Sequence, residues 1–192
     1  MGKIIFDLDD TLYCSKELRL KRDKVIFDFL GPKINEYLLL KKSKGTIESF
    51  KEMGINKKEF FKIINKVPIN VQEDKKLIDM LSEIGKRYEL IVLSNNSEYS
   101  VGETLEKLGI LHLIKNYYNG EYFENEKPHE ECFFMVEKGD ICVGNSFRKD
   151  LEIPKKLGAI TILVSKNKHP ESDFTISNIY ELDSVLKSIE NV

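Results

Sequence analysis

Short apolar runs that alternate with helical segments limit the folds open to this chain more than any other feature. The runs YELIVLS, DICVG and AITILVS follow Pro68, and a similar run covers residues 3–8. Apolar runs of this length are typical of strands that are buried on both faces of a sheet. The helical segments between them would connect one parallel strand to the next. The sequence therefore predicts an α/β fold, a Rossmann-like parallel sheet with helices on both faces.

Residues 15–66 interrupt this alternation with a helical pattern throughout. The segments are SKELRLKRDKVIFDFL, PKINEYLLLKK, TIESFKEMG and INKKEFFKIINKV, the last ending before Pro68. Because the interruption directly follows the first strand, we predict an insertion rather than two domains in tandem. Residues 1–13 and 68–192 would form the α/β core, and residues 14–67 a helical cap insertion.

The remaining segments complete the predicted pattern. We expect helices at residues 73–86, 98–109, 129–139, 153–158 and 178–190, and a short strand or turn at residues 117–123.

Composition excludes several classes of protein. With 192 residues the chain fits one domain with an inserted part, and a formal net charge of -2 gives no electrostatic reason to expect nucleic acid or membrane partners. No apolar run reaches the roughly 18 residues of a membrane span, and no signal peptide is expected. The cysteines Cys14, Cys132 and Cys142 are too widely spaced to suggest a disulfide framework or a zinc site. We expect a cytoplasmic protein and leave its oligomeric state open.

The stretch DLDDTL, residues 7–12, places three carboxylates directly after the first strand. Crowded carboxylates repel one another unless a cation or a proton is present. Helix capping explains one acidic residue here, but not acidic residues at alternate positions after an apolar strand. We interpret Asp7 as a nucleophile, Asp9 as its acid/base partner, and Mg²⁺ as the missing cation.

Polar residues also follow other predicted strands. Ser94, followed by Asn95 and Asn96, ends one strand, and Asn145, with Asp150 five residues later, ends another. Lys127 lies in the loop ENEKPHEE, directly before a proline that we expect to open a helix. Each alone is explained by a cap, a turn or a surface lysine. Because the carboxyl ends of parallel strands meet at one edge, together they predict a phosphate-handling site.

DLDDT, the strand-terminal Ser94, the KP pair at Lys127 and GNSFRKD near residue 150 resemble the motifs of the haloacid dehalogenase superfamily of phosphatases. The likeness covers nearly the whole chain outside the helical segment, whose position matches the small helical cap of the family's first cap class. DLDDTLY also resembles the opening of pyrimidine nucleotidase-like members. The resemblance implies a haloacid dehalogenase-like core with a helical cap.

The resemblance further implies Mg²⁺-dependent hydrolysis of small phosphomonoesters through an aspartyl-phosphate. The implied roles are catalysis for Asp7, Asp9, Ser94 and Lys127, phosphate binding for Ser94, Asn95 and Lys127, and metal binding for Asp7, Asp9, Asn145 and Asp150. The family usually has aspartate where Asn145 stands, and an amide offers a metal an oxygen without the charge. We expect Asp150 to take over part of that role. The expected partner is a small phosphorylated metabolite.

Other functions stay open at this point. Asp9 argues against a dehalogenase, which needs no acid there, whereas a phosphomutase or phosphotransferase would keep all of these signals. A receiver-type signalling domain shares the clustered acids but carries its lysine later and lacks the helical segment. Asn145 also suggests a non-catalytic protein that binds a phosphorylated ligand. Polar candidates for substrate specificity, each also explained as a surface residue, are Tyr13, Arg19, Arg22, Tyr37 and Lys41.

Overall fold

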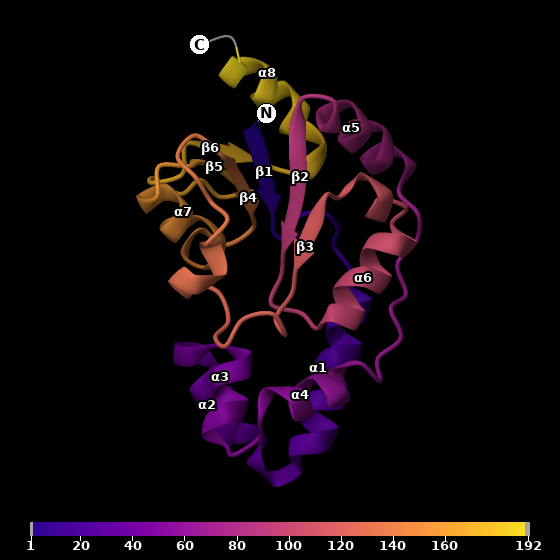
Figure 1. The fold of residues 1–192 in the computed structure, drawn as a ribbon. Coiled ribbons are helices and arrows are strands. Elements are labelled where there is room, and N and C mark those ends of the chain that lie inside the picture. The colour runs from indigo at the N-terminus through magenta and orange to yellow at the C-terminus, as the bar shows by residue number, and fades with distance from the viewer. Residues whose placement is uncertain (1, 191–192) are drawn as a thin grey trace.

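The sheet runs through the centre of the molecule in the computed structural model, which describes residues 2–190 (Figure 1). Its strands are β1 (Gly2–Phe6), β2 (Tyr88–Leu93), β3 (Asn116–Tyr118), β4 (Ile141–Gly144), β5 (Ile160–Val164) and β6 (Phe174–Ile176). They form a six-stranded sheet in the order β3-β2-β1-β4-β5-β6, and every pairing is parallel. The predicted Rossmann-like parallel sheet is confirmed.

Strand β1 lies in the middle of the sheet and is buried on both faces. Ile4 and Phe6 pack into the hydrophobic cluster on one face, and Ile5 packs into the cluster on the other, as expected when successive side chains alternate. Phe6 lies opposite Val92 of β2 and Val143 of β4. This register brings the carboxyl ends of the three strands together.

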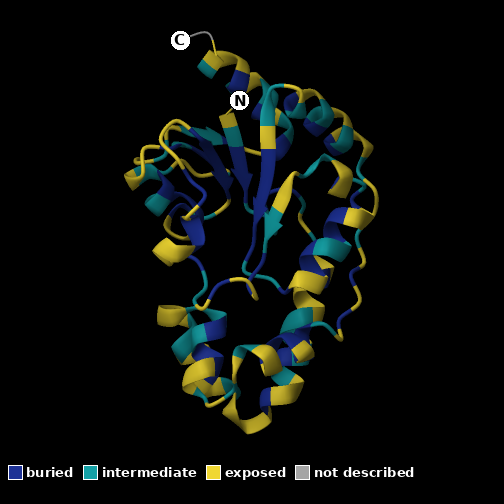
Figure 2. Ribbon diagram, viewed as in Figure 1, coloured by how far each residue is buried: buried dark blue, intermediate teal, exposed yellow. Residues whose placement is uncertain are grey.

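Helices cover both faces of the sheet. On one face lie α5 (Lys75–Gly85), α6 (Glu98–Lys107) and α8 (Leu182–Glu190), whose leucines pack in one cluster with the strands. On the other face lie α7 (Glu152–Lys156) and apolar side chains of residues 123–136. Strands β1, β2, β4 and β5 consequently form a mainly buried layer, whereas β3 at one edge of the sheet is exposed or half-buried (Figure 2).

The helices of residues 16–64 gather at the end of the molecule opposite α8 (Figure 1). They are α1 (Lys16–Leu30), α2 (Ile34–Lys44), α3 (Thr46–Glu52) and α4 (Lys57–Ile64), and we call them the helical block. The block has its own hydrophobic cluster, centred on Tyr37 and Phe50, and the side chains of Ser15 and Asn56 cap α1 and α4. The division of the chain into core and cap stays a prediction.

Two features of the fold differ from expectation. Residues 129–139 were expected to be helical, but only Glu130–Phe133 form a 3-10 turn, and no α-helix begins at Pro128. Side chains satisfy backbone groups of this segment instead, since Asp140 Oδ2 accepts from Glu137 N at 2.9 Å and Lys3 Nζ donates to Met135 O at 2.8 Å. Strand β6 was not predicted.

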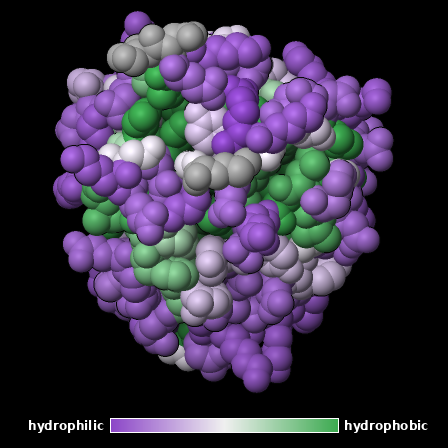
Figure 3. All heavy atoms as spheres, turned by 45° about the horizontal axis from the view of Figure 1, so that its top comes forward, coloured by the Kyte–Doolittle hydropathy of each residue, from purple (hydrophilic) through white to green (hydrophobic). Residues whose placement is uncertain are grey.

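The end of the molecule away from the helical block is mainly hydrophilic, with apolar side chains in small patches between charged ones (Figure 3). Among residues 2–190 no helix combines the length and the apolar character needed to cross a membrane.

Candidate active site

Asp7 lies directly after β1 and continues its hydrogen bonding, because Asp7 N donates to Val143 O at 2.9 Å. Its Oδ1 accepts from Lys127 Nζ at 2.8 Å and its Oδ2 from Thr11 Oγ1 at 2.9 Å. Only 12% of the side chain is exposed. Burial raises the pKa of Asp7 to about 7, although the charge of Lys127 opposes the shift. The hydrogen bonds from Lys127 and Thr11 hold the Asp7 carboxylate in a fixed orientation at the sheet edge.

Lys127 is the buried positive charge of the site. Its ammonium donates to Asp7 Oδ1 and Asp150 Oδ1, both at 2.8 Å, and to Leu93 O at 3.0 Å. Burial lowers the pKa of Lys127, but Asp150 and Asp7 outweigh it, so that the pKa lies above its ordinary value. Lys127 is a permanent cation in contact with the predicted nucleophile.

Asn95 fixes the loop that carries Lys127. Its Oδ1 accepts from Lys127 N at 2.8 Å, and its Nδ2 donates to Lys127 O at 3.3 Å. These contacts leave one N–H of the amide for a phosphate, which was the predicted role of Asn95. They also make Asn95 a positioning residue for Lys127, which the sequence did not indicate.

Ser94 follows β2 and is buried, with Ser94 N donating to Tyr118 O at 3.0 Å. Its hydroxyl oxygen accepts from Asn96 N at 3.2 Å. As the acceptor in this bond, the hydroxyl keeps its own hydrogen for a further acceptor, such as a phosphoryl oxygen.

Asp9 is surrounded by donors from three parts of the chain. Its Oδ1 accepts from Tyr13 OH at 2.6 Å and from Arg22 Nη1 at 3.1 Å, and its Oδ2 accepts from Asn96 Nδ2. Tyr13 and Arg22 were candidates for substrate specificity, whereas Asn96 had no assigned role. No sequence signal distinguishes Asn96 from its neighbours in SNNS.

Asp150 links Lys127 to the loop after β4. Its Oδ1 contacts Lys127, and its Oδ2 accepts from Ser146 N at 3.0 Å. The loop passes so close that a Cβ on Gly144 would lie 2.3 Å from Asp150 Cβ, so glycine is required there. Asn145 is exposed beside it. The metal role of both Asn145 and Asp150 stays a prediction.

The donors at this edge suit a hard cation. Within residues 2–190 no group of three or more His, Cys, Asp or Glu side chains forms a metal cluster. A metal site here would therefore combine carboxylates with the Asp9 backbone carbonyl and the Asn145 amide, all oxygen donors of the kind that Mg²⁺ prefers. The carboxylates of Asp7, Asp9 and Asp150 also outnumber the cationic side chains that contact them, Lys127 and Arg22. The residues present fit Mg²⁺.

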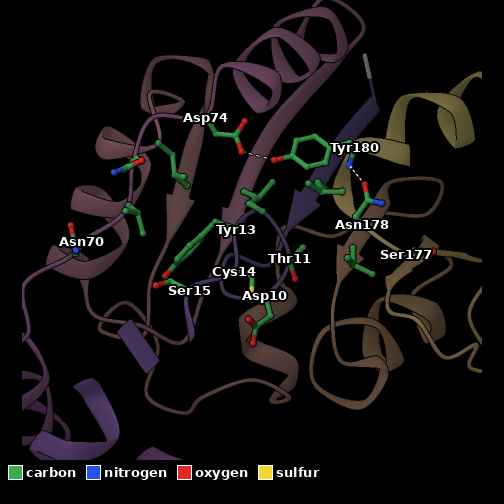
Figure 4. Close-up of a pocket in the computed structure, with 16 residues that line it drawn as sticks. Asp10, Thr11, Tyr13, Cys14, Ser15, Asn70, Asp74, Ser177, Asn178 and Tyr180 are labelled. Atoms are coloured by element: carbon green, nitrogen blue, oxygen red, sulfur yellow. Dashed lines mark hydrogen bonds between the residues drawn. The ribbon is translucent and has the colours of Figure 1, made fainter. Parts of the chain in front are cut away.

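Two cavities lie near this edge of the sheet. The larger, about 660 Å³, is lined by Asp10, Thr11 and Tyr13 together with residues 70–72, 74 and 177–180 (Figure 4). Asp7 and Lys127 line neither this cavity nor the smaller one. The smaller, about 210 Å³, lies between the helical block and the sheet edge, with Arg22 and Phe61 from the block and Asn95 and Asn96 from the core. We call it the interdomain cavity.

Glu126 joins the Lys127 loop to the helical block. Its Oε1 accepts from Ile47 N at 3.1 Å and from Glu48 N at 3.3 Å, at the first turn of α3. Lys57 Nζ of α4 donates to Phe123 O of the same loop. Sequence reasoning missed Glu126, because it is one acidic residue among many in the loop ENEKPHEE.

Comparisons with known proteins find relatives of this chain in sequence and in fold. A family model described as haloacid dehalogenase-like hydrolase matches residues 4–139. The glyceraldehyde 3-phosphate phosphatase of Methanocaldococcus jannaschii is 24% identical over 224 aligned positions, which cover 97% of each chain. Two solved structures share the fold. A phosphatase from Thermococcus onnurineus has a TM-score of 0.73 at 20% identity, over 97% of this chain and 98% of that one. A hydrolase from Bacillus subtilis, solved with bound magnesium, has a TM-score of 0.65 at 14% identity, with the same coverage.

Proposed function

Because this chain belongs to the haloacid dehalogenase-like hydrolases, we propose that it is a Mg²⁺-dependent phosphatase that hydrolyses small phosphomonoesters through an aspartyl-phosphate. The family match confirms the resemblance to the haloacid dehalogenase superfamily and sets aside a receiver-type signalling domain. The first cap class and the likeness to pyrimidine nucleotidase-like members stay predictions. The observation that carries the proposal is the contact of Asp7 with the buried ammonium of Lys127, at 2.8 Å. A carboxylate beside a fixed cation is suited to attack a phosphoryl group, whose charge would otherwise repel it.

In the first step, an oxygen of Asp7 attacks phosphorus and the bond from phosphorus to the ester oxygen breaks. The leaving oxygen takes a proton from Asp9, which is two residues away on the same loop. Thr11 and Lys127 hold the Asp7 carboxylate, so that the nucleophile needs little reorganisation before attack.

In the second step, water attacks the phosphorus of the aspartyl-phosphate. Asp9 removes a proton from that water, and the bond to Asp7 breaks to release inorganic phosphate. Ser94 and Lys127 donate to phosphoryl oxygens and offset the charge of the loose transition state. Asn95 and Asp150 act by holding Lys127 in place.

Residues Asp7, Asp9 and Asn145, with Asp150 as a further candidate, would hold Mg²⁺. When bound, Mg²⁺ offsets the repulsion between the carboxylate of Asp7 and the phosphate.

Small substrates are favoured by the position of the helical block. The block lies over the sheet edge and leaves an interdomain cavity of about 210 Å³, so that it limits access to Asp7 and excludes bulk water. The named activity of the Methanocaldococcus jannaschii relative, on a three-carbon phosphate ester, supports the same size of substrate.

Phosphate release from a panel of phosphomonoesters with Mg²⁺ tests the proposal, with glyceraldehyde 3-phosphate included. Asp7→Asn should abolish turnover and leave the fold intact, because an amide is not a nucleophile and Asp7 lies at a strand end. Asp10→Asn is the matched control. The Asp10 carboxylate contacts Arg19 at 2.6 Å and its φ is 60°, a conformation that asparagine also adopts, so turnover should persist.

Turnover by Asp7→Asn would exclude the covalent mechanism. Absence of turnover in the wild-type protein, with phosphate ester binding retained, would favour a non-catalytic binding protein. Transfer of phosphate to a sugar phosphate rather than to water would identify a phosphomutase or phosphotransferase.

A further inference from the structure

Arg22 of α1 lines the interdomain cavity, and most of the five N–H donors of its guanidinium are without a partner among the described residues. Its Nη1 contacts Asp9 Oδ1 at 3.1 Å, and only 14% of its side chain is exposed. Within the described part of the chain, its Nε and Nη2 atoms are buried without a hydrogen-bond partner. Buried donors without acceptors are unfavourable, so this edge of Arg22 indicates a ligand.

The free edge of Arg22 matches one chemical class of ligand. The N–H bonds of Nε and Nη2 lie side by side in the guanidinium plane and fit the two oxygens of a carboxylate. The cavity, about 210 Å³, holds about seven water volumes, enough for a short carbon chain. Ile26, Phe61 and Ile64 form an apolar part of its wall, which strengthens an ion pair there.

The cationic side chains around the cavity each have a carboxylate nearby. Arg19 and Lys41, which line it, are paired with Asp10 at 2.6 Å and Asp23 at 3.7 Å. The carboxylate of Glu126 also lines the cavity and interacts with the charge of Lys149. Arg22 differs from the other cations in having buried N–H donors without a partner among the described residues.

We propose that Arg22 binds a carboxylate carried by the leaving group of the substrate, so that the preferred substrates are short phosphorylated acids rather than phosphorylated alcohols or aldehydes. This inference rests on the proposed function, since it concerns the same site. Because Arg22 also contacts Asp9, it holds the leaving group beside the acid that protonates its oxygen.

Three compounds with the same three-carbon chain test the inference: 3-phosphoglycerate, glyceraldehyde 3-phosphate and glycerol 3-phosphate, which end in a carboxylate, an aldehyde and an alcohol. The wild-type protein should favour the acid over the alcohol in kcat/KM by on the order of 10- to 100-fold. Arg22→Gln should remove this preference, and Arg22→Lys, which keeps the charge without the fork, should retain part of it. Loss of Arg22 also disturbs Asp9, so hydrolysis of all three compounds should slow together. The measurement is therefore the ratio of kcat/KM for 3-phosphoglycerate to kcat/KM for glycerol 3-phosphate.

Lys21→Gln is the matched control, because it removes the same charge from the same helix. Lys21 is 45% exposed and pairs with Glu17 at 2.6 Å, so the ratio should not change. Equal efficiency on acid and alcohol, preference for the aldehyde, or a preference for the acid that persists in Arg22→Gln would overturn the inference.

If no compound is hydrolysed with Mg²⁺, the proposed function fails, and calorimetry then decides this inference separately. Wild-type protein should bind 3-phosphoglycerate more tightly than glycerol 3-phosphate, and Arg22→Gln should bind the two alike.

Discussion

Replacing Lys127 by methionine tests the buried ion network without any assumption about substrate. The side chains of Lys127 and Asp150 are 3% and 5% exposed, and that of Asp7 is 12% exposed. Methionine keeps much of the length of lysine but leaves two carboxylates without their shared cation. In metal-free protein, the free energy of unfolding at neutral pH should fall by about 3–5 kcal/mol, the usual cost of removing one partner of a buried ion pair.

The distances around Lys127 give an independent estimate of this loss in the free energy of unfolding. Asp7 Oδ1 and Asp150 Oδ1 each lie 2.8 Å from Lys127 Nζ, so they lie within twice that distance of each other. At an effective dielectric constant of about 20, two carboxylate charges so placed repel by about 3 kcal/mol. The loss is limited to this range, because the protein can bind a proton instead of keeping both charges.

The second variant, Asp7→Asn, makes the test specific. In the wild-type background it removes a carboxylate whose pKa burial raises, so the change should be neutral or slightly stabilising at neutral pH. In the Lys127→Met background it removes one of two unpaired charges, and should restore about 1–2 kcal/mol. The expected signature is a clearly larger gain in the Lys127→Met background than in the wild-type background.

Urea unfolding of the four proteins in EDTA, followed by circular dichroism, measures all of these values. Lys107→Met is the control, since Lys107 contacts Ile69 O at 2.7 Å and Glu103 at 3.2 Å but is 41% exposed. It should cost less than about 1 kcal/mol. A similarly small loss for Lys127→Met, or an effect of Asp7→Asn that is equal in the two backgrounds, would refute the reasoning.

Three other predictions concern the metal, the helical block and pH. Asn145→Asp should tighten Mg²⁺ binding by on the order of ten-fold or more, because a charged oxygen replaces a neutral one; an unchanged calorimetric midpoint would mean that Asn145 does not touch the ion. A folded phosphoprotein should be a far poorer substrate than a small phosphomonoester, because the helical block limits the approach to Asp7, and comparable kcat/KM values would contradict this role of the block. Burial raises the pKa of Glu126 above its ordinary value of 4.5, so the folded protein keeps a proton there that the unfolded chain releases. The free energy of unfolding of the wild type, relative to Glu126→Gln, should therefore decrease as pH rises from 4.5 toward neutrality; a difference that does not vary with pH would exclude the effect.

The sequence predicts the sheet and the meeting of its strand ends well, for a physical reason. Runs such as IVLS and ICVG cannot be exposed, and parallel strands must place their following loops at one edge. Asp7 and Lys127 are therefore in contact although 120 positions separate them. The helical pattern of residues 15–66 is equally clear, because apolar residues recur at helical spacing over several turns.

Contacts between the helical block and the core could not be predicted in this way. The bond from Arg22 to Asp9 and the bonds from α3 to Glu126 depend on how the block packs against the sheet edge, which periodicity does not encode. Strand β6 is three residues long and pairs only with β5, too short for a recognisable alternation. The sequence of residues 129–139 resembles that of an amphipathic helix, because Cys132, Phe133, Met135 and Val136 are apolar at near-helical spacing. These side chains are buried against the sheet, although the segment does not form an α-helix.

The central position of β1 also determines when the site can form during synthesis. β1 ends at Phe6, but its neighbours begin only at Tyr88 and Ile141. Both edges of β1 are unpaired until β2 has left the ribosome, and one edge stays unpaired until β4 follows. Until then, Asp7 also lacks the Val143 carbonyl that orients its backbone. The helical block, whose contacts are local in sequence, can fold before the sheet does. The nascent chain therefore carries a strongly apolar strand that is not paired on both edges through most of its translation, and this interval is when aggregation or chaperone binding is expected.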